Sequence, residues 1–327
     1  MRAAHPRILV GLWLDRSGPV LRAIGISDHG NPFGHAFGSN YYSAFYAQSS
    51  ENLPLYYLSL PLIFFVVAPD GSSRLHRLAH LIYAQNWMKV YVSMAGHYWF
   101  LAVEAQFYLL WPLVVHRFKP RRVLWISAAG AAAGIPLRFA LLAAQVDTYY
   151  LYQNTFARMD TLLVGAACAC LLREEAPAKA LFRHSKWLWA APLVILPIFK
   201  LSSNAVGFYW ATHRYGYTVI ALAYASLLLG AIVTMGSGSI LQRFFTSGIM
   251  RAFEKYCYAA YVWHRIVAAG VQACERKTHT PLPWFVEIPL MIATFAVSMA
   301  SYALIERPFL ALKRRFEPRY ALAAPAH

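Results

Sequence analysis

The feature that most constrains this chain is a series of apolar runs, each close to the length of a membrane-spanning helix. We place eight of them, at residues 54–69, 97–116, 122–144, 157–172, 186–201, 217–235, 256–272 and 284–305. A helix needs about 20 apolar residues to cross a bilayer, so the three shortest runs must recruit flanking residues. Because an open sheet cannot span a bilayer, the runs predict an all-α, polytopic transmembrane helix bundle.

The composition agrees with a membrane protein. Hydrophobic residues make up 59% of the 327 positions and charged residues only 13%, whereas soluble domains carry about 25% charged residues. The formal charge of +16 raises the alternative of nucleic-acid binding. We reject nucleic acid as a partner, since the Lys and Arg residues flank the apolar runs and form no single basic stripe.

The positions of these basic residues predict how the bundle is oriented. Lys and Arg are concentrated in the loops 117–122, 173–186 and 236–255 and in the tail from residue 306. The positive-inside rule places these segments, and hence the C-terminus, in the cytoplasm.

One carboxylate, Glu104, lies inside the apolar run 97–116. A charge in hydrocarbon is costly unless it is paired, hydrogen-bonded or hydrated, so two interpretations stay open. Glu104 either acts in a functional site or only pins two helices together, and its candidate partners are Arg138, His264 and Arg265. Arg138 lies deep in a run rich in Ala and Gly, and it needs a carboxylate or carbonyl partner of its own.

Five short motifs follow one another along the chain. They are Pro54–Tyr57 (PLYY), His97–Pro112 (HYWFLAVEAQFYLLWP), Arg158–Gly165 (RMDTLLVG), Tyr256–His264 (YCYAAYVWH) and Ile305–Phe309 (IERPF). Their order and spacing resemble the acyltransferase 3 family of integral-membrane O-acyltransferases, and the resemblance covers about residues 54–316. It implies transfer of an acyl group, often acetyl, from acyl-CoA to a hydroxyl of a carbohydrate, lipid-linked or other cell-surface acceptor.

The resemblance also suggests site residues and a location. The catalytic candidates are Glu104, His264 and His97, because acyl transfer to a hydroxyl requires a proton acceptor. The substrate-binding candidates are Trp99, Tyr108, Arg158, Asp160, Tyr258 and Trp263. We expect no metal and no bound cofactor, acyl-CoA as donor substrate, and the bacterial inner membrane as the location.

Four of these candidates also have a structural alternative. His97 would then be an interfacial residue at a helix start, and His264 a buried packing residue. Arg158 and Asp160 would cap a helix, where Asp160 suits the electrostatics of a first turn.

The N-terminal part departs from the family pattern. Nothing before residue 54 reproduces the family's first span, which carries a histidine regarded as essential. Residues 43–53 lack the basic run that is thought to hold the acyl-CoA phosphates. We therefore divide the chain into an atypical segment 1–53 (a remnant of lost or altered spans), an acyltransferase-like domain 54–316 and a cytoplasmic tail 317–327. The alternatives are a truncated, inactive family member and a transporter with Glu104 in an ion path.

Overall fold

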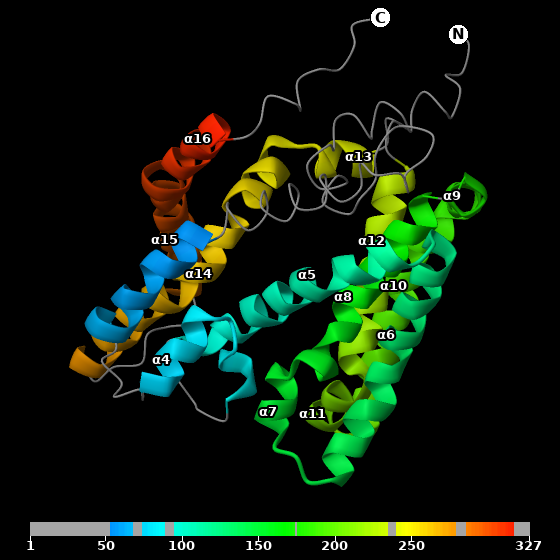
Figure 1. Cartoon of the computed structure of the whole chain (residues 1–327), viewed down its shortest axis with the longest axis horizontal. Helices are drawn as coiled ribbons and strands as arrows, with labels where there is room; N and C mark the ends of the chain where they lie inside the picture. The colour runs from blue at the N-terminus through cyan, green and yellow to red at the C-terminus, as the bar shows by residue number, and fades with distance from the viewer. Residues whose placement is uncertain are drawn as a thin grey trace, which may run out of the picture. The chain divides into compact units, whose positions relative to one another are not determined.

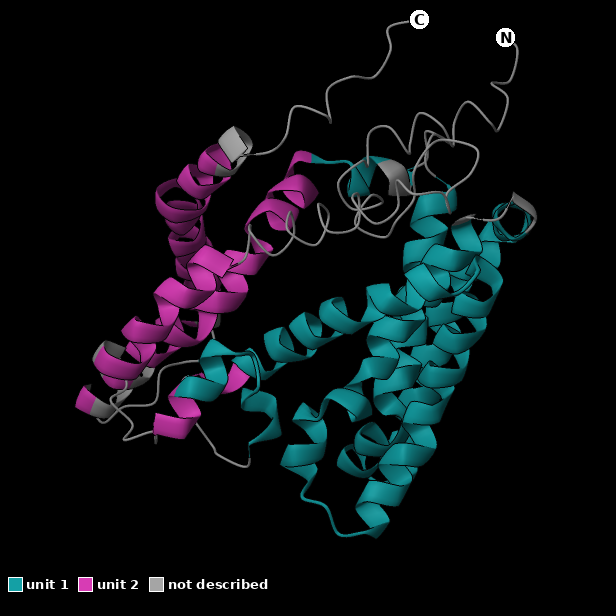
Figure 2. Cartoon of the chain, in the orientation of Figure 1, with its two compact units in different colours: residues 1–44, 78–90, 98–247 teal, residues 45–77, 91–97, 248–327 magenta. Residues whose placement is uncertain are grey.

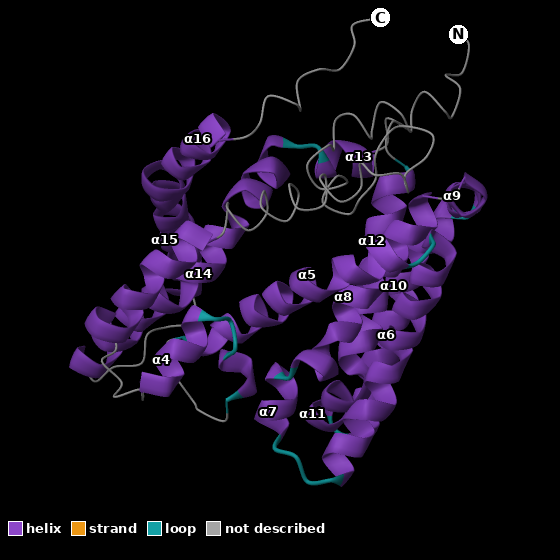
Figure 3. Ribbon diagram, in the orientation of Figure 1, coloured by secondary structure: helices purple, strands orange, loops and turns teal. Residues whose placement is uncertain are grey.

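The computed structural model describes residues 53–67, 74–88, 95–173, 175–234, 240–278 and 286–316. These residues are almost entirely helical, and no strand occurs among them (Figure 3). The predicted all-α class is therefore confirmed. The predicted atypical segment, up to residue 52, and the predicted tail 317–327 lie outside the described residues.

Six helices of the described chain are long and apolar enough to cross a membrane. They are Gly96–Arg117, Pro120–Ala143, Thr148–Leu172, Ser185–Val206, Phe208–Val233 and Ile288–Leu312. Each overlaps a predicted span, and the short runs at 157–172 and 186–201 are extended by flanking residues as expected. The polytopic membrane character predicted from the sequence is confirmed.

The other two predicted spans differ from these six for separate reasons. The run at 54–69 forms a shorter apolar helix, Leu53–Phe65. The run at 256–272 lies in the 31-residue helix Gly248–Thr278, which is long enough but less apolar, because residues such as His264 and Arg265 interrupt its aliphatic sequence.

The helices form two compact units (Figure 2). Unit 1 comprises residues 1–44, 78–90 and 98–247, and unit 2 comprises residues 45–77, 91–97 and 248–327. Each unit thus combines segments that are far apart in the sequence. The short helices α4 (Arg74–Leu81) and η3 (Gly96–Tyr98) are divided between the units.

Unit 1 is a bundle in which α8 is the central helix (Figure 1). Its elements are η2 (Gln85–Trp87), α5 (Trp99–Arg117), α6 (Pro120–Ala143), α7 (Thr148–Gln153), α8 (Thr155–Arg173), α9 (Glu175–Arg183), α10 (Ser185–Val206), α11 (Phe208–Ala211), η4 (Thr212–Gly216), α12 (Tyr217–Val233) and α13 (Ile240–Phe245). Helix α8 packs extensively against α6 and also contacts α5, α7 and α12, while α10 packs against α12.

Small residues of α6 allow α8 to approach closely. A Cβ atom at Gly130 would lie 2.7 Å from Cδ1 of Leu163, and one at Gly134 would lie 3.0 Å from Cβ of Asp160. Small residues are common where membrane helices meet, because they let the backbones come together. The Ala- and Gly-rich sequence of α6 thereby brings Arg138 within reach of α8.

Unit 2 is built mainly from its C-terminal helices. Its elements are the helical residues 53–61, η1 (Leu62–Val67), α14 (Gly248–Thr278), α15 (Glu287–Ser301), η6 (Tyr302–Glu306) and α16 (Arg307–Phe316). Helices α14 and α15 pack side by side, and Tyr256 lies edge-on to Phe295 with ring centroids 5.5 Å apart.

Candidate functional site

The residues proposed from the sequence divide between the two units. Unit 1 contains Trp99, Glu104, Tyr108, Arg158 and Asp160, and unit 2 contains His97, Tyr258, Trp263 and His264. Each unit brings some of its candidates together.

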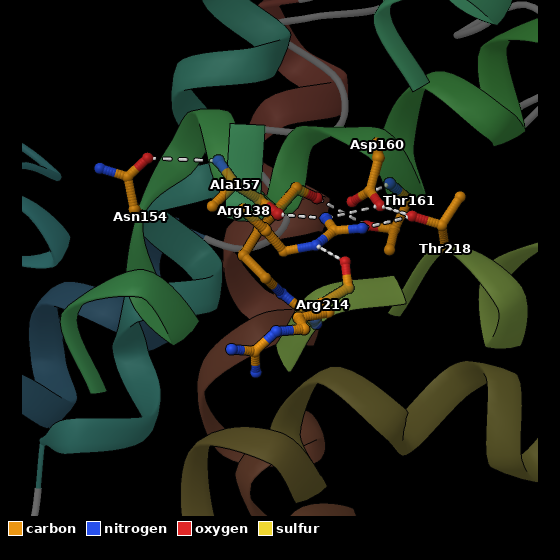
Figure 4. Close-up of polar contacts among 8 residues, drawn as sticks. Arg138, Asn154, Ala157, Asp160, Thr161, Arg214 and Thr218 are labelled. Atoms are coloured by element: carbon orange, nitrogen blue, oxygen red, sulfur yellow. Dashed lines mark hydrogen bonds and ion pairs between the residues drawn. The ribbon is translucent and has the colours of Figure 1, made fainter. Parts of the chain in front are cut away.

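The interior of unit 1 contains an ion pair between Arg138 of α6 and Asp160 of α8 (Figure 4). Nη1 of Arg138 lies 2.9 Å from Oδ2 of Asp160, and both side chains are completely buried. The same guanidinium donates to the carbonyl oxygens of Ala157 at 2.7 Å and Arg214 at 2.8 Å, and to Oγ1 of Thr218 at 2.5 Å. The predicted need of Arg138 for a carboxylate or carbonyl partner is confirmed.

Asp160 is fully engaged in this network. Its Oδ2 also accepts a hydrogen bond from the Thr218 hydroxyl, and its Oδ1 accepts one from the backbone N–H of Thr161 at 2.9 Å. The residue is 1% exposed. Because the ion pair joins α6 to α8 and Thr218 adds α12, Asp160 stabilises the bundle, and its contact with a substrate stays a prediction.

Arg158 lies on the same helix as Asp160 but has a different environment. Its guanidinium carbon lies 3.8 Å from the ring centroid of Tyr217, 5.4 Å from that of Trp99 and 5.5 Å from that of Tyr152. The rings of Trp99 and Tyr152 also contact one another, with centroids 4.6 Å apart. A cation over aromatic faces is attracted by the ring quadrupoles. We call these four residues the arginine–aromatic cluster.

The Arg158 guanidinium keeps hydrogen-bonding capacity that the cluster does not use. Its Nε and Nη1 atoms are buried, and they have no hydrogen-bond partner among the described residues. The nearby Asp160 is occupied by Arg138. Arginine remains charged in proteins and carries five N–H donors, and aromatic faces offer no acceptor oxygen.

A polar network holds η2 against α5 and the start of α8. Gln106, two residues after Glu104, donates to the carbonyl oxygen of Tyr83 at 2.7 Å and to Oδ1 of Asn86 at 2.9 Å. Thr155 donates to Gln106 Oε1 at 2.5 Å and accepts from Asn86 at 2.7 Å. Gln106 therefore has a structural role in the motif that also contains Glu104.

Unit 2 brings together His97 and His264, two of the catalytic candidates. Their ring centroids lie 4.8 Å apart, with an angle of 73° between the ring planes. Tyr261 contacts both rings, at 5.4 Å from His97 and 5.7 Å from His264, and its hydroxyl donates to the carbonyl oxygen of His97. The sequence analysis did not predict this contact, although Tyr261 lies one helical turn before His264 within a single motif.

The surroundings of His264 favour one tautomer of its ring. Nδ1 lies 2.6 Å from the carbonyl oxygen of Tyr261, which can only accept a hydrogen bond. We therefore assign the proton of the neutral ring to Nδ1, an assignment made from the hydrogen-bond geometry. Nε2 then carries the lone pair that a general base requires.

Glu104 is half-buried on α5, and no described residue forms a hydrogen bond or ion pair with its carboxylate. The suggested partnership with Arg138 is wrong, because the small residue Gly134 lets Asp160 of α8 reach that guanidinium instead. Tyr108, one turn further along α5, is 37% exposed. The roles of Glu104 and Tyr108 stay predictions.

Tyr258 and Trp263 both lie on α14 and are half-buried. Trp263 is adjacent to His264 in sequence, and its buried Nε1 atom has no hydrogen-bond partner among the described residues. Their proposed contacts with substrate also stay predictions.

Tyr152 and Tyr217, which contact Arg158, were missed, because Tyr152 lies outside the recognised motifs and Tyr217 starts an ordinary apolar run.

Comparison with known proteins gives a consistent set of similarities. A family model described as "Acyltransferase domain" matches residues 34–303. The chain is similar to O-acetyltransferase OatA of Staphylococcus aureus strain NCTC 8325, with 26% identity over 249 residues, covering 71% of this chain and 40% of the relative. It is also similar to a putative O-acetyltransferase of strain COL, with 21% identity over 256 residues and the same coverage. No solved structure matches the chain.

Proposed function

The chain belongs to the acyltransferase domain family, and we propose that it is a membrane O-acyltransferase that moves an acyl group, typically acetyl, from acyl-CoA to a hydroxyl of a carbohydrate or other cell-surface acceptor. The names of the relatives support acetyl as the transferred group. The chain matches only 40% of the length of those relatives, so the activity of the whole protein is part of this proposal. Family membership favours an enzyme over the transporter suggested by the position of Glu104.

The contact between His97 and His264 is the observation that carries the proposal. Acyl transfer to a hydroxyl requires a group that removes the hydroxyl proton, and histidine suits this task near neutral pH. The Tyr261 carbonyl holds the proton of His264 on Nδ1 and so leaves Nε2 as a proton acceptor. His97 packs edge-on against this ring and limits its rotation, which makes it a positioning residue.

The reaction then follows from the chemistry of a thioester donor. Nε2 of His264 takes the proton of the acceptor hydroxyl while the oxygen attacks the thioester carbonyl carbon. When the carbon–sulfur bond breaks, the acyl group stays on the acceptor oxygen as an ester. The protonated His264 returns its proton to the departing thiolate, so that the enzyme is regenerated.

The orientation of unit 1 in the membrane is a further part of the proposal. The basic loops 117–122 and 173–186 face the cytoplasm, and the starts of α5 and α8 lie at the outer end of the bundle. Cysteines introduced at Lys179 and at Ala144, one in a basic loop and one at the opposite end of α6, test this orientation. A membrane-impermeant reagent added to intact cells should label Ala144→Cys alone, and equal labelling of both would contradict the proposal.

The direct test of function is acyl transfer from labelled acetyl-CoA in membranes that contain the full chain. His264→Asn keeps an amide that can donate to the Tyr261 carbonyl but removes the base at Nε2. General acid–base catalysis contributes about 10²–10⁴-fold, so we expect a loss of that size. His116→Asn, at an exposed histidine near the other end of α5, is the matched control and should keep full activity.

Two outcomes would overturn parts of this account. Full activity of His264→Asn would show that another group removes the proton. Absence of any acylated product with the unmodified protein, in membranes where the chain is inserted, would favour the inactive family member instead.

A further inference from the structure

The arginine–aromatic cluster of unit 1 takes no part in the proton transfer described above. We propose that the Arg158 guanidinium binds a carboxylate or phosphate group of the acceptor, which makes the acceptor an acidic sugar rather than a neutral one. This inference rests on the proposed function only for calling the ligand an acceptor. The binding of an anionic sugar at Arg158 stands on the geometry of the cluster.

Arg158 is a partly buried cation that forms no ion pair with a described residue of unit 1. The acidic side chains that are described in this unit are Glu104, Asp147 and Asp160. Asp160 pairs with Arg138, Asp147 caps α7 by accepting from the N–H groups of residues 149 and 150, and Glu104 forms no ion pair with a described residue. A buried charge without an ion-pair partner is unfavourable, so an anion that pairs with Arg158 is stabilised there.

The donors of Arg158 have the geometry for an oxyanion. Nε and Nη1 are buried and without a hydrogen-bond partner among the described residues. Each of these nitrogens can act with Nη2 as one arm of the planar fork that binds carboxylate or phosphate in a bidentate way, and charge-assisted hydrogen bonds of this kind are among the strong ones. The residue as a whole keeps partial exposure, although Nε and Nη1 themselves are buried.

The position of Arg158 on α8 supports the same conclusion. Helix α8 begins at Thr155 after the cap residue Asn154, whose Oδ1 accepts from the N–H groups of residues 156 and 157. Arg158 is thus in the first turn, where the helix dipole disfavours a cation and favours an anion. An anion bound at the guanidinium interacts favourably with the helix dipole and so offsets the unfavourable interaction of the Arg158 charge with it.

The aromatic residues around Arg158 suit a sugar ring. Binding sites for small molecules are usually lined by aromatic side chains with a few polar groups that fix orientation. Trp99, Tyr152 and Tyr217 supply the aromatic faces, and Arg158 supplies the polar group. Free phosphate lacks the sugar ring and should bind more weakly than a sugar phosphate.

The test is a binding measurement on the purified full chain in micelles of a neutral detergent, where no lipid headgroup competes. The probes are glucuronate, glucose 1-phosphate, inorganic phosphate and glucose, and the readouts are the unfolding temperature and calorimetric affinity. We expect both acidic sugars to bind and to raise the unfolding temperature, phosphate to bind more weakly and glucose not to bind. Arg158→Gln should weaken the acidic sugars about 10- to 100-fold, as expected for a lost charge-assisted hydrogen bond.

Arg214→Gln is the matched control. Arg214 also stacks on an aromatic ring of unit 1, with its guanidinium carbon 4.0 Å from the centroid of Trp210, and its side chain is solvent-accessible. The control should bind the acidic sugars normally. If Arg158→Gln does not yield folded protein, Arg158→Lys keeps the charge without the planar fork, and its binding should be weaker but detectable.

The outcomes separate this inference from the proposed function. Equal binding of glucose and glucuronate, or unchanged binding in folded Arg158→Gln, would overturn the inference. Phosphate binding as tight as glucose 1-phosphate would overturn the assignment to a sugar. Arg158-dependent binding of acidic sugars by a chain that transfers no acyl group would support the anion site and contradict the O-acyltransferase proposal.

Discussion

Two arginines of unit 1 lie at helix α8, Arg138 packed against it from α6 and Arg158 in its first turn, and their surroundings differ. Arg138 is completely buried, pairs with Asp160 and donates to three further oxygen atoms. Arg158 lies among three aromatic rings, and its Nε and Nη1 have no acceptor among the described residues. The donors of Arg138 are thus used within the bundle, whereas Arg158 keeps two donors with which it can bind a ligand.

Breaking the Arg138–Asp160 pair should have the largest effect on stability. Asp160→Ala leaves a buried guanidinium without its counter-ion, so we expect a loss of about 3–5 kcal/mol in the free energy of unfolding. The measurement is denaturant unfolding of the purified protein in micelles. Asp147→Ala, which removes only the exposed cap of α7, should cost about 1 kcal/mol.

A double substitution sharpens this prediction. Replacing a whole buried ion pair by apolar residues is often neutral, so Arg138→Met added to Asp160→Ala should recover much of the lost stability. The interpretation of Arg138 as a structural residue fails if Asp160→Ala is as mild as Asp147→Ala, or if the double variant is less stable than Asp160→Ala.

Closing the space at Gly134 should have an intermediate effect. A Cβ atom there would meet Asp160 Cβ at 3.0 Å and Arg138 Nη1 at 3.3 Å, two groups that are fixed by their own ion pair. We expect Gly134→Ala to lower the free energy of unfolding by about 1–3 kcal/mol, the usual cost of overpacking.

Gly130→Ala is the comparison for this site. Its nearest neighbour is Cδ1 of Leu163, the flexible end of a side chain, so the same substitution should cost less. Thermal unfolding of both variants under the same conditions gives the difference. A larger loss at Gly130 than at Gly134 would contradict the idea that the ion pair is the rigid part of this packing.

Removing the charge of Arg158 should have the smallest effect on stability. Its cation–π contacts favour the folded state, but its unsatisfied buried donors oppose it, so Arg158→Gln should change the free energy of unfolding by less than about 1 kcal/mol. The measurement is denaturant unfolding without added ligand. A loss as large as that of Asp160→Ala would show that Arg158 is structural and would remove the contrast between the two arginines.

The sequence predicted the helices and some of their polar requirements because hydropathy is a local property. Arg138 needed a partner wherever it lay in an apolar run. That this partner is Asp160 depends on the close approach of α6 and α8 at Gly134, which is a property of the packed bundle. For the same reason the sequence suggested Arg138 as a partner of Glu104. The carboxylate of Glu104, on α5, forms no ion pair with a described residue.

The site was predicted residue by residue but not as an arrangement. His97 and His264 were both candidates, yet their contact depends on how α14 packs within unit 2. Tyr152 lies in the short helix α7, between two spans, where no apolar pattern or motif draws attention to it. Contacts between distant segments are set by tertiary packing, so composition and spacing could supply the members of the site and not their geometry.

The most direct test of the central claim is a steady-state comparison of His264→Asn and Arg158→Gln in acyl transfer from labelled acetyl-CoA to an acidic sugar. A group that acts only in the transition state changes kcat, and one that binds substrate and transition state equally changes KM. The account predicts that His264→Asn lowers kcat with little change in the acceptor KM, and that Arg158→Gln raises the acceptor KM with little change in kcat. An unchanged kcat in His264→Asn, or a loss of kcat at constant KM in Arg158→Gln, would contradict it.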